Sequence, residues 1–204
     1  MKWENCIPII FHVIHNGESV GSGDNISAAL INAQIDQLNQ DFRKYGSGAN
    51  NNPVGADTEI EFCAATVNPS GSTLSEPGIN RINRSSKGWG SPPFGACVGQ
   101  NFDDSEIENT VKPQSIWNPD DYLNIWVLDM SCGILGYAQF PSNSGLGGLN
   151  NNGGSASTDG VAVIPSSVGS ISNPNPAGGS YNKGRTLTHE IGHWIGLRHI
   201  WGDG

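Results

Sequence analysis

The sequence predicts an α+β domain in which helices pack on a twisted sheet. First, short runs rich in β-branched and aromatic residues alternate with loops of Gly, Asn and Ser. Second, their order is a strand, a helix, several strands and a final helix, as in layered architectures. Third, 204 residues with 36% hydrophobic content suit one domain with a real core. Only 14% of residues are charged, but six tryptophans indicate a folded chain with long polar loops.

The N-terminal part is predicted to form a strand followed by the longest helix. Residues 7–15 are β-rich and bounded by turn residues, which predicts a buried strand. The next apolar positions recur at helical spacing, which predicts an amphipathic helix over residues 27–45: Ile31, Ile35, Leu38 and Phe42. Asn25 or Ser27 is a suitable N-cap, and Gly46 would end the helix.

The rest of the chain is predicted to supply further strands and one more helix. Residues 84–120 and 142–159 are rich in Gly, Pro, Ser and Asn and are predicted to be mostly loop. A helix is expected over residues 184–197. The predicted strands are residues 59–67, 78–82, 122–128, 136–140 and 160–164.

Charge and hydropathy exclude two classes of partner. The net charge of −9 and the pI of about 4.8 give an acidic surface that repels phosphate backbones, so nucleic-acid binding is not expected. No apolar run approaches the roughly 18–20 residues of a transmembrane helix. The start of the chain is too short and strand-like for a signal peptide, so we expect a removed signal or a start inside a longer protein.

The cysteine pattern favours an oxidising compartment. None of the four cysteines lies in a CxxC pair, which argues against a cysteine zinc site. An even, widely spaced set is compatible with two disulfides in any of three connectivities, with buried free thiols as the alternative. The four are Cys6, Cys63, Cys97 and Cys132.

The final helix carries the residues that point to a chemistry. His189 and His193 are four residues apart, so an α-helix places them on one face, where both imidazoles can ligate one Zn²⁺. Glu190 follows the first of them and could act as general base on a zinc-activated water. A catalytic zinc has three protein ligands. Gly196 tolerates the positive φ of a sharp turn that would bring His199 to the metal as the third.

Other polar residues are interpreted as structural. His12 and His15 are three apart on a strand and face opposite sides, so they cannot form a joint site. A calcium site is the alternative interpretation of two segments that are better explained as solvated loops. One contains Asp103, Asp104 and Glu106, and the other spans residues 150–154.

The extended HExxHxxGxxH pattern resembles the metzincin clan of zinc metallopeptidases. The surrounding sequence is similar to its pappalysin family, especially secreted bacterial members, across nearly the whole chain. The segments that carry this resemblance are residues 26–43, 60–64, 122–127, 135–141 and 182–203.

The resemblance implies a metzincin-like fold and a secreted zinc endopeptidase acting on protein or peptide substrates. It implies a mostly parallel sheet with an antiparallel edge strand, a backing helix and an active-site helix. His189, His193 and His199 would be the zinc ligands and Glu190 the general base. The edge strand would bind substrate through main-chain hydrogen bonds. Its residues are Gly136, Tyr137, Ala138, Gln139 and Phe140.

One feature departs from the family pattern. Metzincins carry a Met-turn downstream of the third histidine, whereas this chain ends at Gly204 and its methionines are Met1 and Met130. Residues 1–204 are therefore expected to be the N-terminal subdomain of a monomeric enzyme, without the C-terminal subdomain. The alternatives are a catalytically incomplete zinc-binding fragment, a non-catalytic secreted binding module, or a thermolysin-like peptidase with a downstream Glu ligand. The spacing of His199 and the lack of such a Glu argue against the last.

Overall fold

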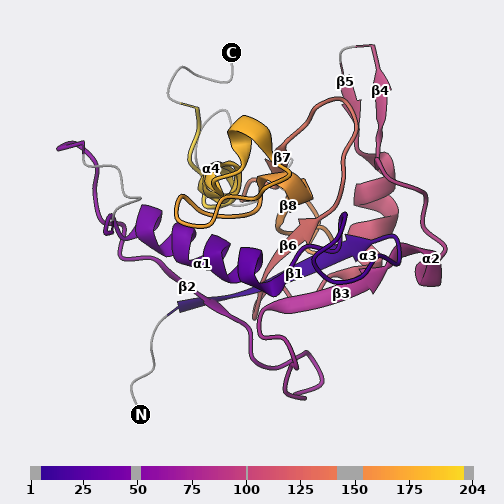
Figure 1. The fold of residues 1–204 in the computed structure, drawn as a ribbon, viewed down its shortest axis with the longest axis horizontal. Coiled ribbons are helices and arrows are strands. Elements are labelled where there is room, and N and C mark those ends of the chain that lie inside the picture. Colours follow the sequence, from indigo (N-terminus) through magenta and orange to yellow (C-terminus); the bar gives the residue numbers. More distant parts are fainter. Residues whose placement is uncertain (1–5, 47–51, 100, 142–153, 200–204) are drawn as a thin grey trace.

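The computed structural model describes residues 6–46, 52–99, 101–141 and 154–199, which form a mixed sheet with helices on both faces (Figure 1). The predicted α+β fold class is confirmed. The strands of the main sheet are β1 (Cys6–His15), β2 (Glu61–Ala64), β3 (Ile79–Asn83), β6 (Leu123–Val127), β7 (Gly136–Ala138) and β8 (Val161–Val163).

Strand β1 is the longest strand and pairs with three others, β2, β3 and β6. The strand order is β2-β1-β6-β8-β7, and β3 pairs with the second half of β1 on the edge where β2 pairs with the first. All of these pairs are parallel except β7 with β8, which is antiparallel. Strand β7 ends this order, so the predicted mostly parallel sheet with an antiparallel edge strand is confirmed.

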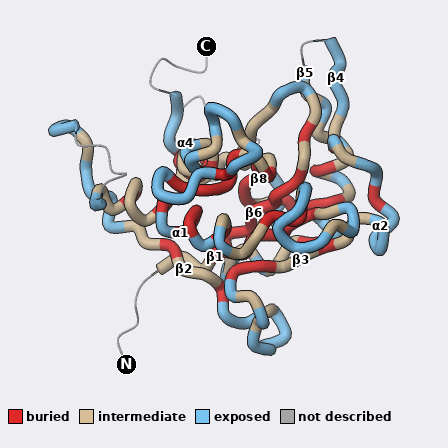
Figure 2. Tube along the Cα trace, in the orientation of Figure 1, coloured by how far each residue is buried: buried red, intermediate tan, exposed pale blue. Residues whose placement is uncertain are grey.

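Alternation along the strands divides the core into two layers. Ile125 and Val127 of β6 pack with α1 (Ala28–Phe42) and α4 (Arg185–Trp194) on one face. Trp126 and Leu128 pack on the other face against η1 (Ile107–Val111), a π-helical turn that continues into α3 (Lys112–Ser115). Figure 2 shows the buried residues concentrated along the central strands, with exposed loops around them.

Helix α1 is shorter than predicted. Ser27 is its N-cap, and the Ser27 hydroxyl accepts a hydrogen bond from the Leu30 amide. The helix ends at Phe42 rather than near Tyr45, because Lys44 adopts a positive φ of 50° that an α-helix cannot accommodate. Helix α4 begins after Gly184, which has a φ of 75°.

The prediction that residues 84–120 are mostly loop was wrong. They contain η1 and α3 together with α2 (Arg84–Lys87) and the hairpin of β4 (Ala96–Val98) and β5 (Asn101–Asp103). The hairpin projects beyond the main sheet (Figure 1). Ile107 and Val111 are fully buried, which explains why a segment rich in polar residues is helical here.

Two disulfides are present, as predicted, and the structure selects one of the three connectivities. Cys6 in β1 is bonded to Cys63 in β2, and Cys97 in β4 to Cys132 in the connection before β7. Two 3₁₀ turns, η2 (Pro165–Ser167) and η3 (Gly179–Tyr181), lie between β8 and α4. Within the described ranges, none of the helices has the length and apolar character needed to cross a membrane.

Candidate metal centre

The structure brings the three histidines of the C-terminal motif together. The Nε2 atoms of His189 and His193 are 3.0 Å apart, and each is 3.1 Å from Nε2 of His199. The first two come from successive turns of α4, while the third follows a turn at Gly196, whose φ is 97°. Each of the three side chains offers one potential metal-ligating atom, and these atoms all lie within 4.8 Å of one another. Among the described residues, no other group of three such side chains is found.

The surroundings favour a neutral His189 and one tautomer of His193. Nδ1 of His193 lies 2.7 Å from the Leu197 carbonyl oxygen, which can only accept a hydrogen bond, so Nδ1 carries the proton. Nε2 of His193 is then left with a free lone pair directed at its two neighbours. Burial, together with the nearby His193 and His199, lowers the pKa of His189.

The donor set fits a zinc ion. Two nitrogens bound to one tetrahedral zinc at about 2.0–2.1 Å stand about 3.3 Å apart, close to the separations of 3.0–3.1 Å found here. Three lone pairs at such distances repel one another unless a cation or protons lie between them. A shared metal ion removes that repulsion.

Glu190 lies beside the trio and is buried, with 8% of its surface exposed. Burial raises the pKa of its carboxyl to about 7, although His199 acts in the opposite direction. The side chain runs close under the edge strand: a Cβ atom at Gly136 would lie 3.0 Å from Cγ of Glu190. A glycine at this position therefore leaves room for the Glu190 side chain.

Three cavities adjoin the trio in the described part of the chain, and one of them, of about 380 Å³, lies between the end of α4 and the turn before His199. Another, of about 280 Å³, separates the histidines from β7, and the Phe140 ring lies 5.1 Å from that of His193. The lining of this cavity comprises Gly136, Tyr137, Ala138, Phe140, His189, Glu190, His193 and His199.

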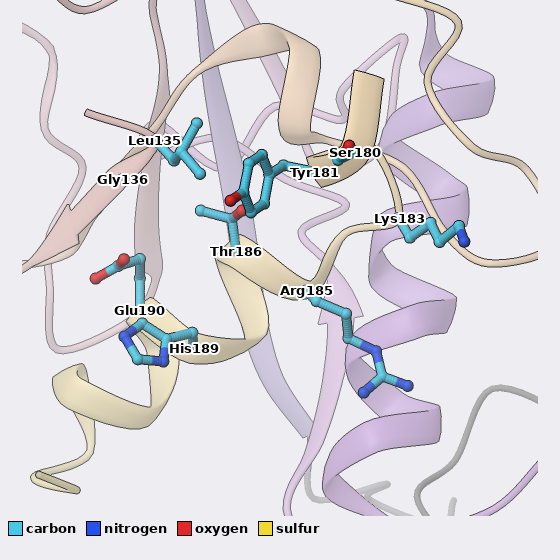
Figure 3. A pocket seen from close by; sticks show the side chains of 9 residues that line it. All are labelled: Leu135, Gly136, Ser180, Tyr181, Lys183, Arg185, Thr186, His189 and Glu190. Atoms are coloured by element: carbon cyan, nitrogen blue, oxygen red, sulfur yellow. The ribbon is translucent and has the colours of Figure 1, made fainter. Parts of the chain in front are cut away.

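The third cavity, of about 460 Å³, lies toward the start of α4 (Figure 3). Leu135, Tyr181 and Thr186 lie around this space, whereas the side chains of Lys183 and Arg185 extend away from it. The space is therefore mainly apolar, and it reaches His189 and Glu190.

Not every residue of the predicted edge segment lies in the strand. Strand β7 ends at Ala138 instead of Phe140, although the Gln139 amide still donates to the Gly160 carbonyl at 3.1 Å. The Gln139 side chain is occupied elsewhere: its Oε1 accepts a hydrogen bond from the Thr158 hydroxyl at 2.8 Å.

Helix α1 contributes polar residues to this region that sequence reasoning missed. Gln34 and Gln37 are fully or almost fully buried, and they bond to backbone groups of Gly169, Gly184 and Ile171. Asp41 accepts a hydrogen bond from the Thr188 hydroxyl at 2.8 Å, one residue before His189. The available signal was the occurrence of three polar residues on the apolar side of the predicted helix.

The remaining predicted sites stay apart from the trio. His12 is fully buried between Asn124 and Asn80, at 2.9 and 3.0 Å, and burial lowers its pKa to about 4. The Asp103 carboxylate accepts from Ser105, and the Glu106 carboxylate from the Gly90 amide at 2.9 Å. Calcium binding there stays a prediction, and residues 150–153 of the second segment lie outside the described residues.

Comparison with known proteins gives consistent matches. A family model described as Pregnancy-associated plasma protein-A, Peptidase M43, matches residues 105–204. An extracellular metalloprotease of Colletotrichum graminicola is 26% identical over 97% of this chain and 52% of its own length. Extracellular metalloprotease 1 of Coccidioides posadasii is 28% identical over 95% of this chain and 52% of its own. The chain thus spans about half the length of these relatives.

Solved structures agree with these matches. Mature mirolysin of Tannerella forsythia, in complex with a cleaved peptide, superposes with a TM-score of 0.71 at 36% identity. The match covers 97% of this chain and 65% of the mirolysin chain. The fold is that of metzincin-type zinc metallopeptidases. Within that class, the chain is similar to the pappalysin family, Peptidase M43, whose model matches its C-terminal half.

Proposed function

We propose that this chain carries the catalytic centre of a secreted zinc-dependent endopeptidase. The observation that carries the proposal is the convergence of three histidine Nε2 atoms beside a buried carboxylate, below an open sheet edge. Each component has a role in hydrolysis of a peptide bond in a protein substrate.

His189, His193 and His199 would hold the ion, with Gly196 providing the turn that precedes the third ligand. Zinc bound by three protein ligands supplies a Lewis acid and lowers the pKa of a coordinated water to about 7. The Leu197 carbonyl keeps the tautomer of His193 in which Nε2 is free to bind.

Glu190 would be the general base. Its carboxylate accepts a proton from the attacking water and then delivers it to the amine nitrogen that leaves. Burial by itself raises the pKa of this carboxyl and so favours proton uptake, while a bound cation would favour the carboxylate form that accepts the proton. Burial that raises this pKa also keeps bulk water away from the carboxyl.

The edge of β7 that has no paired strand among the described residues would bind the substrate. A peptide can pair with a free sheet edge through main-chain hydrogen bonds, and residues 136–140 present that edge beside the trio. Gly136, Tyr137, Ala138, Gln139 and Phe140 remain the proposed substrate-binding segment. The related mirolysin structure contains a cleaved peptide, which supports such a role.

We propose that residues 1–204 form the N-terminal subdomain of a metzincin catalytic domain, since the extracellular relatives are about twice as long. Two disulfides and the names of these relatives support secretion. A single copy of the chain supplies all three proposed ligands, so the proposed metal centre needs no second copy, and a monomer stays the proposed state.

The test combines metal content with hydrolysis. Mass spectrometry should find one zinc per chain, and casein hydrolysis should be lost with a chelator and restored by zinc. The variant Glu190→Gln should keep the zinc and lower the rate by roughly 10²–10⁴-fold. Zinc without any hydrolysis would favour the alternative, a non-catalytic or incomplete zinc-binding unit. Unchanged turnover in Glu190→Gln would exclude Glu190 as the base.

A further inference from the structure

A buried charged cluster lies directly behind the edge strand, on the side of the sheet away from the histidines. The Tyr137 hydroxyl donates a hydrogen bond of 2.7 Å to Oε1 of Glu108. The Lys112 ammonium lies 2.5 Å from the same oxygen, in an ion pair that is not aligned as a good hydrogen bond. It also stands over the Tyr137 ring, 4.6 Å from its centroid.

Burying the charges of Lys112 and Glu108 is unfavourable, so their stability depends on the contacts between them. The Lys112 side chain is 1% exposed and that of Glu108 is 26% exposed. Burial lowers the pKa of Lys112, while Glu108, Asp104 and Asp159 favour its charged form. A buried ammonium without a partner would be strongly destabilising, so Lys112 holds Glu108 in place.

Strand β7 is otherwise attached mainly through its backbone, which continues to bond at Leu135 and Gln139. It is three residues long and pairs with β8 along one edge. Gly136 and Ala138 face α4 and have little or no side chain to pack there. Tyr137 is therefore the large side chain of the strand, and it packs into the opposite core layer.

We propose that Glu108 and Lys112 hold Tyr137 and thereby fix the position of the substrate-binding edge above the metal centre. Tyr137, Glu108 and Lys112 are positioning residues, because they act through the backbone of β7. The inference rests on the proposed function, since the edge matters if a peptide pairs with it. It adds a role for η1 and α3, which lie across the sheet from the trio.

The test is Tyr137→Phe, which removes the hydroxyl and keeps the ring beneath the Lys112 ammonium. Hydrogen exchange should accelerate at least about tenfold in residues 135–140, while β6 and α4 keep their rates. For an extended quenched-fluorescent peptide, KM should rise roughly tenfold with kcat changed less than about threefold. The zinc content should stay the same.

Tyr122→Phe is the matched control. The Tyr122 hydroxyl also donates one hydrogen bond, to the Val67 carbonyl at 3.1 Å, but Tyr122 lies outside the cluster. This variant should change neither exchange in residues 135–140 nor KM.

Each outcome decides the inference. Unchanged exchange in Tyr137→Phe would overturn it, as would faster exchange with the kinetics of the wild type. If the zinc-loaded wild-type protein hydrolyses no peptide, the proposed function fails. The exchange data then still decide whether the cluster holds the strand.

Discussion

The side chain of Gln34 connects the backing helix to the start of the helix that carries the proposed ligands. Its Nε2 donates to the Gly184 carbonyl at 3.0 Å, and its Oε1 accepts from the Gly169 amide at 3.1 Å. Gly184 is the N-cap of α4, and all three residues are buried. Gln34→Leu keeps the approximate volume and removes both hydrogen bonds.

The magnitude follows mainly from the Gly169 amide, which loses its hydrogen-bond partner, because the Gly184 carbonyl still accepts a hydrogen bond from the Thr188 amide at 3.3 Å. Each unsatisfied buried polar group costs about 1–3 kcal/mol. The added apolar character of leucine offsets part of this cost, so we expect the free energy of unfolding to fall by about 2 kcal/mol. That is a large fraction of the roughly 5–15 kcal/mol typical of a domain.

Urea unfolding followed by tryptophan fluorescence, with chelator present, measures this loss without any contribution from metal. Asn32→Ala is the control, because Asn32 is exposed on the same helix and its replacement should change stability by less than about 0.5 kcal/mol. A loss below about 1 kcal/mol in Gln34→Leu would refute the reasoning, since the Gly169 amide would then have found another partner.

Two further predictions concern the metal centre and the pH dependence of stability. His199→Ala should weaken zinc binding by more than the roughly 10–100-fold that follows loss of an outer hydrogen-bond partner. Zinc titration against a competing chelator measures this, and an unchanged affinity would exclude His199 as a ligand. Burial, with Asp129 and Glu18 nearby, raises the pKa of Asp24 to about 6. The folded state then holds this proton more tightly than the unfolded state, so the contribution of Asp24 to stability is present below about pH 4 and is lost as pH rises through 6. Asp24→Asn should therefore raise the free energy of unfolding at pH 8 by about 1 kcal/mol, after discounting for partial exposure, and leave it nearly unchanged at pH 4. Equal effects at both pH values in chemical denaturation would contradict this assignment.

The proposed metal centre could be predicted from the sequence, because its three histidines lie close together in the chain. His189 and His193 are related by one helical turn, and His199 follows within six residues of the second. The helix period and one glycine turn therefore suffice to predict their convergence. Strand β6 could be predicted equally well, because its apolar residues, interrupted only by Asn124, are typical of a strand buried on both faces.

The parts that were missed depend on partners distant in the chain. Gln34 and Asp41 find Gly184 and Thr188 at separations of 150 and 147 residues, which no periodicity reveals. The segment around Lys112 was predicted to be loop, because a lysine is rarely buried. Its burial is explained by contacts with Glu108 and with the distant Tyr137, which the sequence alone does not reveal.

The long strand β1 also constrains the order in which the chain can fold. Its parallel partner β6 lies more than a hundred residues later, and His12 meets Asn124 across a separation of 112 residues. At roughly 5–20 residues per second of synthesis, β1 waits several seconds before β6 emerges. Its run of isoleucines and phenylalanine is meanwhile without the neighbour that buries it. We therefore expect slow folding through late parallel pairing, with β1 as the segment that most needs a chaperone during synthesis.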